Sequence, residues 1–177
     1  MNTVWADTSG IHDDLVTEAD LRDWLLAAEV ADRITTCSRQ ELTRARLLRD
    51  ALRRLAWFLT DDPREAARSS LTDLDEAMAA VNALTADAQP DQLALRHGQL
   101  TLSGDASAAS ATAALARVAT DAVHLLTGTE AAQLRACQAP GCVLYFVKTH
   151  PRREWCSEAC GNRTRAARHY RRIRKPG

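Results

Sequence analysis

The chain has 177 residues, 46% of them apolar, and 23 basic against 23 acidic side chains, so its formal net charge is zero. This length suits one ordinary domain or a medium domain followed by a very small one, and the apolar content excludes an intrinsically disordered chain. The sequence has neither an apolar run of about 18 residues nor a basic and then apolar stretch at its start, so we expect no membrane span, no secretory signal and a cytoplasmic location.

The zero net charge hides an asymmetry along the chain. Residues 1–136 carry 13 basic and 21 acidic side chains, a net charge of −8, whereas residues 137–177 carry 10 and 2, a net charge of +8. Phosphate groups are repelled by the first part and attracted by the second. The two parts are therefore expected to have different partners.

The first half of the chain predicts three helices. Thr17 can cap a helix that begins at Glu18, because Asp20 follows three residues later as a weak capping box. A second helix is predicted over Arg39–Leu59 and a third over about Leu71–Leu84. The residues expected to face the core are Leu21, Trp24, Leu25 and Ala28, then Leu48, Leu52, Leu55, Ala56 and Leu59, then Leu74, Met78 and Val81.

A short β-hairpin is predicted next, over residues 93–102. Leucines alternate with other residues on both sides of His97-Gly98, and Gly98 suits the positive φ of a hairpin turn. The leucines of this pattern are Leu93, Leu95, Leu100 and Leu102.

A fourth helix is predicted over about Ala108–Thr127, with Gly128 as its C-cap and a helical connector over Thr129–Arg135. Its expected core residues are Leu115, Val118, Ala122 and Leu125. Together these elements predict a mainly α-helical domain with a small β-hairpin over residues 1–130, followed by a separate C-terminal module over residues 131–177.

The C-terminal module holds four cysteines with the spacing C-x4-C-x13-C-x3-C. In a reducing compartment such close pairs favour metal ligation over disulfides, and four thiolates complete the tetrahedron of one structural Zn²⁺ with no position left for a catalytic water. The predicted ligands are Cys137, Cys142, Cys156 and Cys160. Cys37 lies far from them in sequence, and we expect it to be a buried, inert thiol.

The residues around these cysteines predict a treble-clef zinc finger. Val143–Thr149 has the composition of a strand, His150–Arg153 of a turn, and Glu154-Trp155 of a segment returning toward the third ligand. Ser157 is a suitable N-cap, which would place Cys160 in the first turn of a helix, where the helix dipole favours a thiolate.

That helix is strongly basic. At about 100° per residue, Ala166, Tyr170 and Ile173 form an apolar stripe, which we expect to pack near Phe146 or Trp155. Cations with almost no acidic neighbours gather on the other side and indicate nucleic acid as the target, with an acidic protein or another anion as the alternative. These candidate contacts are Arg165, Arg168, Arg171, Arg172 and Lys175.

Other polar residues have two interpretations. Asn162 is expected to hydrogen-bond locally, and Arg163 to offset the negative charge of the zinc site. A face of the second helix carries arginines that, with Asp7, would receive an anionic ligand, or else are exposed and paired with the acidic surface. These arginines are Arg46, Arg49 and Arg53.

The string from Trp155 to Arg165 resembles the CGNR zinc-finger family, whose motif stands here as Cys160-Gly161-Asn162-Arg163. The N-terminus resembles the ABATE domain, which precedes the finger in that family. The residues that carry this second resemblance are Asp7-Thr8, Gly10, Asp14-Leu15, Thr17, Ala19-Asp20-Leu21 and Trp24-Leu25, with Asp7 where asparagine is expected. The resemblance implies a stress-induced transcription regulator with a DNA-binding finger and an N-terminal domain that binds a ligand.

The favoured function is therefore a DNA-binding regulator, and the alternative is an interaction protein whose finger binds RNA or an acidic protein. An enzyme is not expected, because the sequence has no phosphate-binding loop, nucleophile elbow or histidine pair at metal-ligand spacing. A finger this small buries little surface, so sequence specificity would call for a homodimer or a partner.

Overall fold

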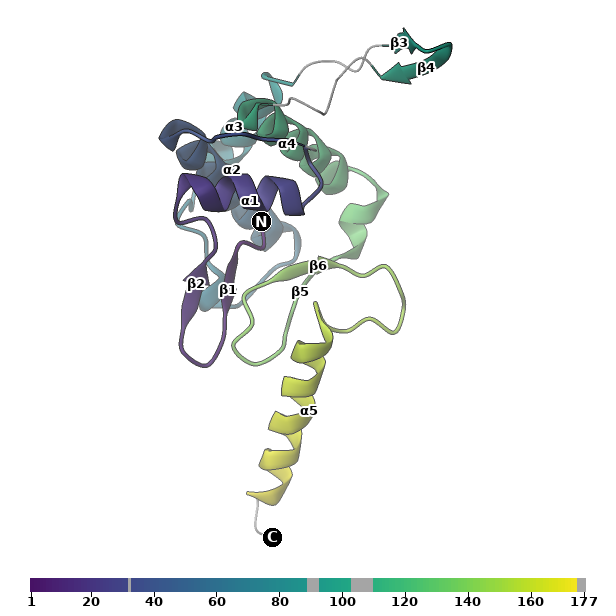
Figure 1. Ribbon diagram of the computed structural model, residues 1–177. Coiled ribbons are helices and arrows are strands. Elements are labelled where there is room, and N and C mark those ends of the chain that lie inside the picture. The colour runs from purple at the N-terminus through teal and green to yellow at the C-terminus, as the bar shows by residue number, and fades with distance from the viewer. Residues whose placement is uncertain (32, 89–92, 103–109, 175–177) are drawn as a thin grey trace.

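The computed structural model describes residues 1–31, 33–88, 93–102 and 110–174. Four helices form an N-terminal body and a fifth projects away from it toward the C-terminus (Figure 1). The helices are α1 (Glu18–Ala27), α2 (Arg39–Leu59), α3 (Leu74–Thr85), α4 (Ala111–Thr127) and α5 (Glu158–Ile173), with short 3-10 turns η1 (Glu65–Ala67) and η3 (Thr129–Gln133). No described helix has the length and apolar character that crossing a membrane requires.

The strands form three antiparallel pairs, each of two strands, within the described residues. The pairs are β1 (Val4–Ala6) with β2 (Ile11–Asp13), β3 (Leu93–Arg96) with β4 (Gln99–Leu102), and β5 (Leu134–Ala136) with β6 (Tyr145–Val147). The mainly helical class with a small C-terminal zinc finger is thus confirmed.

The starts of α1 and α2 are fixed by complete capping boxes. Thr17 and Asp20 cap α1 as predicted, and Ser38 and Glu41 do the same for α2. Glu41 also accepts hydrogen bonds from the backbone and hydroxyl of Thr112 at 3.1 Å. The cap of α2 therefore also ties this helix to the first turn of α4.

The core lies around α2, which contacts α1, α3 and α4. Its centre is built from leucine and alanine side chains with almost no exposed surface, among them Leu21, Leu25, Leu48, Ala51, Ala77, Ala114 and Leu115. Three residues predicted to face the core are exposed instead: Ala28, Leu59, which is 44% exposed, and Met78, which is 42% exposed. α3 starts at Leu74 instead of Leu71, because the Asp73 side chain caps it, and it turns Ala77 to the core instead of Met78.

The predicted hairpin is present, with Leu95 paired to Leu100 across the turn. His97 and Gly98 both have positive φ, 50° and 77°, as a two-residue hairpin turn requires. The hairpin stands clear of the helices in Figure 1, and Leu93, Leu95 and Leu100 are more than 70% exposed. The predicted start of the fourth helix, Ala108, lies outside the described residues, and the described helix begins after its N-cap, Ser110.

The strand in the finger is shorter than predicted. Of the predicted Val143–Thr149 only Tyr145–Val147 forms a strand, and it pairs with Leu134–Ala136, whose first two residues lie in the segment predicted as a helical connector. The cysteine turn over residues 137–142 reverses the chain directly, which brings β6 beside β5.

We expect Leu115→Ala to lower the free energy of unfolding by about 2–5 kcal/mol, because it opens a cavity at a side chain that is 1% exposed. The control is Leu95→Ala, which removes a leucine that is 71% exposed and should change stability by less than about 0.5 kcal/mol. Urea denaturation followed by circular dichroism at 222 nm measures both. A large effect of the control would contradict the hairpin position described here.

Candidate zinc centre and basic helix

The four C-terminal cysteines come together at one point. One sulfur from each of Cys137, Cys142, Cys156 and Cys160 lies within 4.8 Å of the others. The Sγ atoms of Cys142 and Cys156 are 3.8 Å apart, and those of Cys156 and Cys160 are 3.5 Å apart. A tetrahedron with Zn–S bonds of about 2.3 Å has S–S edges of about 3.8 Å. The residues therefore fit one structural Zn²⁺.

The first ligand pair lies in a tight turn between β5 and β6. The Cys137 N–H donates to Leu144 O at 3.0 Å, and the Cys142 N–H donates to Ala139 O at 3.0 Å. Gly141 has a φ of 72°, which an L side chain rarely adopts, so glycine suits this turn. The Leu144 N–H points at the Cys142 sulfur at 3.5 Å, where it can stabilise a thiolate.

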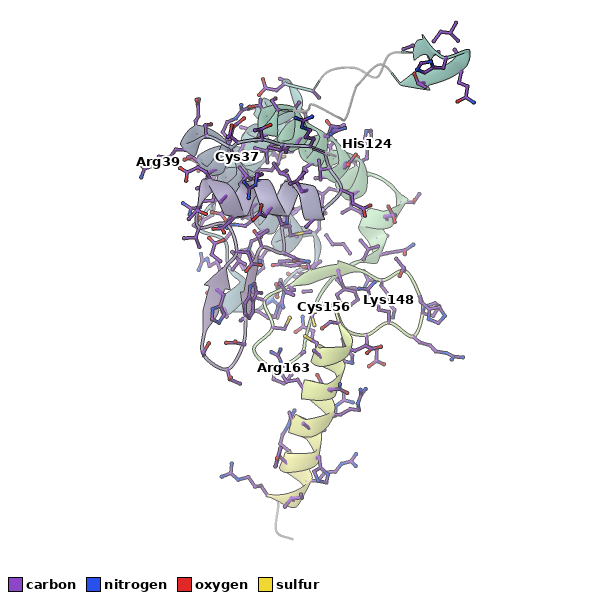
Figure 2. The ribbon with its side chains drawn as sticks, viewed as in Figure 1. Cys37, Arg39, His124, Lys148, Cys156 and Arg163 are labelled. Carbon is purple, nitrogen blue, oxygen red and sulfur yellow. The ribbon has the colours of Figure 1, made fainter. Side chains whose placement is uncertain are left out.

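The second ligand pair lies at the start of α5, as predicted. Ser157 is the N-cap, and its hydroxyl accepts from the Cys160 N–H at 3.3 Å. This places Cys160 in the first turn, at the positive end of the helix dipole. Figure 2 shows Cys156 beside this end of α5.

Gly161 in the CGNR string is explained by packing. A Cβ at this position would lie 3.1 Å from Cδ1 of the Trp155 ring. The glycine therefore lets the indole lie closely against the first turn of α5. This close approach holds the segment before Cys156 beside the helix that carries Cys160.

The two residues after Gly161 fix the helix locally. Arg163 Nη1 donates to Pro140 O at 3.1 Å, so it joins α5 to the turn of the first ligand pair, an interaction with backbone that the expected charge offset did not include. Asn162 Oδ1 accepts from Arg165 Nη2. Figure 2 shows Arg163 on the side of α5 near the cysteine cluster.

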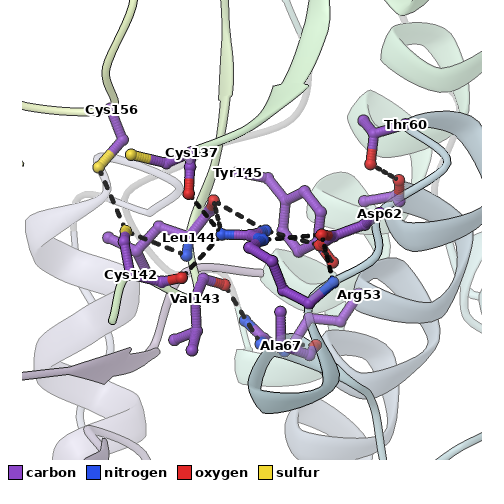
Figure 3. Close-up of polar contacts among 12 residues, drawn as sticks. Arg53, Thr60, Asp62, Ala67, Cys137, Cys142, Val143, Leu144, Tyr145 and Cys156 are labelled. Carbon is purple, nitrogen blue, oxygen red and sulfur yellow. Dashed lines mark hydrogen bonds and ion pairs between the residues drawn. The ribbon is translucent and has the colours of Figure 1, made fainter. Parts of the chain in front are cut away.

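Three residues of the N-terminal domain support the zinc centre: Asp62 and Arg64, which carry no signal in the sequence, and Arg53, which the sequence marks only as an anion-binding or exposed arginine. Asp62, Arg64 and Arg53 meet the finger near Tyr145, as Figure 3 shows for the labelled Asp62 and Arg53. Arg64 donates to the carbonyl oxygens of Cys137 and Cys142. No sequence motif signals these contacts, because they join residues more than 70 positions apart.

Without a bound cation, the pKa values of neighbouring cysteine thiols shift in opposite directions. The hydrogen bond from Cys142 lowers the pKa of Cys137 to about 4, and burial raises the pKa of Cys156 to about 12. The pKa of Cys142 is also raised, because its proton is held by Cys137 and its surroundings are buried. Cys37 is half-buried and far from this cluster, and burial raises its pKa, which is consistent with an inert thiol.

The apolar stripe of α5 does not pack as predicted. Tyr170 and Ile173 are 67% and 65% exposed, and the buried face of the helix is formed by Cys160, Gly161 and Thr164 in its first two turns. The reason is geometric: β5 and β6 have three residues each and cover only the base of a helix of 16 residues. The rest of α5 projects away from the body (Figure 1).

The predicted basic contacts lie on this projecting part. Arg165, Arg168, Arg171 and Arg172 are exposed, and Lys175 lies outside the described residues. Within the described ranges, no carboxylate comes within 4.0 Å of these four guanidinium groups. Their charges are therefore available to an external anion.

The three α2 arginines that the sequence marks as ligand candidates have partners within the fold. Arg46 donates to Leu15 O and Val16 O, and Arg49, which is 8% exposed, pairs with the carboxylates of Asp13 and Asp50. Arg53 is 3% exposed and donates to Ala67 O and Val143 O. The expectation that these arginines are exposed is thus wrong for Arg49 and Arg53.

Asp7 lies apart from those arginines, in the turn between β1 and β2. Its Oδ1 accepts from the backbone and hydroxyl of Ser9 at 2.7 Å and from His12 Nε2 at 2.9 Å. Ser9 Oγ meets the same Nε2 at 3.1 Å. A catalytic triad needs serine and aspartate on opposite ring nitrogens, so this cluster is not arranged as one.

The fold and the site define the class as a helical domain joined to a four-cysteine zinc finger. Residues 1–129 match the ABATE family, described as a putative stress-induced transcription regulator, and residues 133–173 match the CGNR zinc finger. The chain belongs to the ABATE family and carries the CGNR finger after the ABATE domain, which confirms the resemblance. Both matches are of regulator and zinc-finger type and not of an enzyme family. Searches of curated proteins and of solved structures each found no match.

We expect Cys160→Ser to lose zinc, because a hydroxyl is a poor substitute for a thiolate in a four-sulfur site. Elemental analysis of freshly purified, reduced protein should find about one zinc per wild-type chain and much less in the variant. Cys37→Ala is the matched control and should keep its zinc. A Cys160→Ser protein with full metal content would overturn the assignment of this ligand.

Zinc binding is expected to release protons. Because the pKa values of Cys142 and Cys156 are raised above neutrality, both thiols carry protons at pH 7 without metal and must lose them to ligate it. Zinc affinity should therefore fall as pH falls, by at least about two orders of magnitude per pH unit, because at least these two protons are displaced. Calorimetry in buffers of different ionisation enthalpy measures this number. Release of clearly fewer than two protons per zinc would contradict this prediction.

Proposed function

We propose that the projecting part of α5 binds DNA and that the chain is a transcriptional regulator whose N-terminal domain senses a small ligand. The observation that carries this proposal is a row of exposed arginines without carboxylate partners in the described chain, on a helix that points away from an acidic body. The regulator-type family supports the same role.

The dimensions of α5 suit a nucleic-acid groove. Its 16 residues span about 24 Å at 1.5 Å per residue, and a helix fits the major groove of B-DNA. At about 100° per residue, Arg165, Arg168 and Arg172 share a face, and Arg171 lies at its edge. The further contact that the sequence predicts, Lys175, lies outside the described residues. Arginine can grip phosphate oxygens or a guanine edge with its planar fork.

The charge asymmetry along the chain suggests a different role for each domain. We propose that residues 1–130 form the sensing domain and residues 131–177 the DNA-binding module, and that a homodimer supplies specificity that one small finger lacks. For the ligand, an apolar groove of about 280 Å³ between α2, α3 and α4, bordered by Phe58 and Met78, is a better candidate than the occupied arginines. Thermal-shift screening with apolar small molecules, against Met78→Glu, tests this part.

We expect binding of the zinc-loaded protein to duplex DNA to weaken steeply with salt. Four phosphate contacts give a log–log slope of roughly −3.6, and Arg168→Gln should weaken binding to all sequences and reduce the slope by about one unit. Fluorescence anisotropy titrations at several salt concentrations measure both quantities. Arg39→Gln, an exposed arginine at the start of α2, is the control and should bind as the wild type does.

Three outcomes distinguish the alternatives. Salt-sensitive binding to RNA but not to duplex DNA would favour the RNA-binding alternative. If the protein bound neither RNA nor duplex DNA at low ionic strength, the nucleic-acid proposal would be wrong, and an acidic protein partner would be favoured. If Arg168→Gln removed preference at one base pair only, Arg168 would be a base-reading residue and not a phosphate contact.

A further inference from the structure

The N-terminal domain reaches into the zinc finger through one arginine. Arg64 lies between α2 and η1, and its Nη1 donates to Cys137 O at 2.7 Å and to Cys142 O at 2.8 Å. Both Nη atoms also lie 3.5 Å from Leu144 O. The carbonyl groups of these three residues can be followed in Figure 3. One guanidinium thus binds the backbone at both ends of the turn that presents the first two ligands.

Asp62 fixes the position of this guanidinium. Its Oδ1 accepts from Arg64 Nε at 2.7 Å and its Oδ2 accepts from Arg64 Nη2 at 2.6 Å, a two-point pair that sets both distance and plane. The Asp62 side chain has no exposed surface, and that of Arg64 is 13% exposed. Solvent therefore screens this pair far less than it screens a surface ion pair.

Tyr145, a residue of the finger, contacts both members of this ion pair. Its hydroxyl donates to Asp62 Oδ2 at 2.8 Å, and the Arg64 guanidinium lies 5.2 Å from its ring centroid. Tyr145 is 1% exposed and begins β6, three residues after Cys142. Asp62 is thus bound by one residue from each part of the chain.

The other ligand carbonyls are held from within the finger. Cys156 O accepts from Arg153 at 3.1 Å, and Cys160 O accepts from the Thr164 hydroxyl at 3.0 Å. In the part of the chain that the structure describes, Arg64 is the one side chain from outside the finger that hydrogen-bonds a ligand carbonyl. Of the four ligand residues, two therefore have their carbonyl groups bound by a side chain of the N-terminal domain.

We propose that Arg64 is a positioning residue of the zinc centre, supplied by the N-terminal domain, and that zinc binding and the stability of that domain are linked through it. The guanidinium holds the turn in the shape that aims the Cys137 and Cys142 sulfurs, and its charge offsets the net negative charge of a four-thiolate zinc site. Linkage is reciprocal: whatever displaces Arg64 weakens zinc binding, and loss of zinc loosens the segment around Arg64.

The first test measures zinc release from the zinc-loaded full chain into an excess of a metallochromic chelator. We expect Arg64→Gln to release zinc about 10- to 100-fold faster than the wild type, a typical effect for residues that support metal ligands. Arg64→Lys keeps the positive charge but loses the planar guanidinium, so its rate of zinc release should lie between those of the wild type and Arg64→Gln. Arg68→Gln is the matched control, since Arg68 lies in the same segment, is half-exposed and pairs with Glu65.

Two further readouts separate positioning from a general loss of structure. The visible d–d spectrum of the Co²⁺-substituted protein reports ligand geometry and should shift in Arg64→Gln but not in Arg68→Gln. Hydrogen exchange over residues 61–69 should speed up on zinc removal in the wild type and show no further increase in Arg64→Gln. The proposal would be overturned if wild type and Arg64→Gln released zinc at equal rates. It would also be overturned if zinc removal left the hydrogen-exchange rate of residues 61–69 unchanged in the wild type.

A milder variant covers the case in which Arg64→Gln does not fold. Tyr145→Phe keeps the buried ring and removes only the hydrogen bond to Asp62, so it should release zinc faster than the wild type while keeping its helix content. Unchanged release in this variant would count against the link. None of these measurements uses DNA, so a failure of the DNA proposal would appear separately as absent salt-sensitive binding with the zinc link intact.

Discussion

Asp62 and Arg64 form a buried ion pair at the junction of the two parts of the chain, and the arrangement of the zinc centre depends on it. Burial raises the pKa of Asp62, but hydrogen bonds from Arg64 and Tyr145 outweigh burial and hold that pKa below its usual range. The carboxylate stays charged, so it can orient the guanidinium that binds the backbone of Cys137 and Cys142. Burying such a pair is costly unless each partner is fully hydrogen-bonded, and here the finger's own carbonyl groups and the Tyr145 hydroxyl complete the set.

This junction changes how the finger should be regarded. A module with two three-residue strands and one helix cannot bury a core of its own, and zinc replaces part of that core. The structure shows a second source of support: Tyr145 and Leu134 pack against Ala56 of α2, and Asn2 pairs with both backbone groups of Tyr145. The base of the finger therefore packs against the N-terminal body, and the distal part of α5 projects away from both.

Exposure of the distal helix bears on the proposed DNA binding. Because the short hairpin covers only its base, α5 presents both its arginines and its apolar residues Tyr170 and Ile173 to the surroundings. A helix that projects beyond its domain can enter a groove without the domain colliding with the partner. In the proposed DNA complex, phosphates would repel the acidic body and attract the basic helix.

The sequence by itself determined the parts of the protein that depend on local chemistry. The spacing of the cysteines predicted the zinc ligands, Ser157 predicted the start of α5, and Thr17 with Asp20 predicted the start of α1, since caps and close ligand pairs involve residues only a few positions apart. Alternating leucines around His97-Gly98 predicted the hairpin for the same reason. Tertiary structure alone decided which faces are buried: it left Met78 and Tyr170 exposed, buried Arg49 and Arg53, and paired β6 with β5. It also decided the contact between Arg64 and the zinc turn, because hydrogen bonds between residues more than 70 positions apart follow from how the chain packs and leave no periodicity or spacing in the sequence.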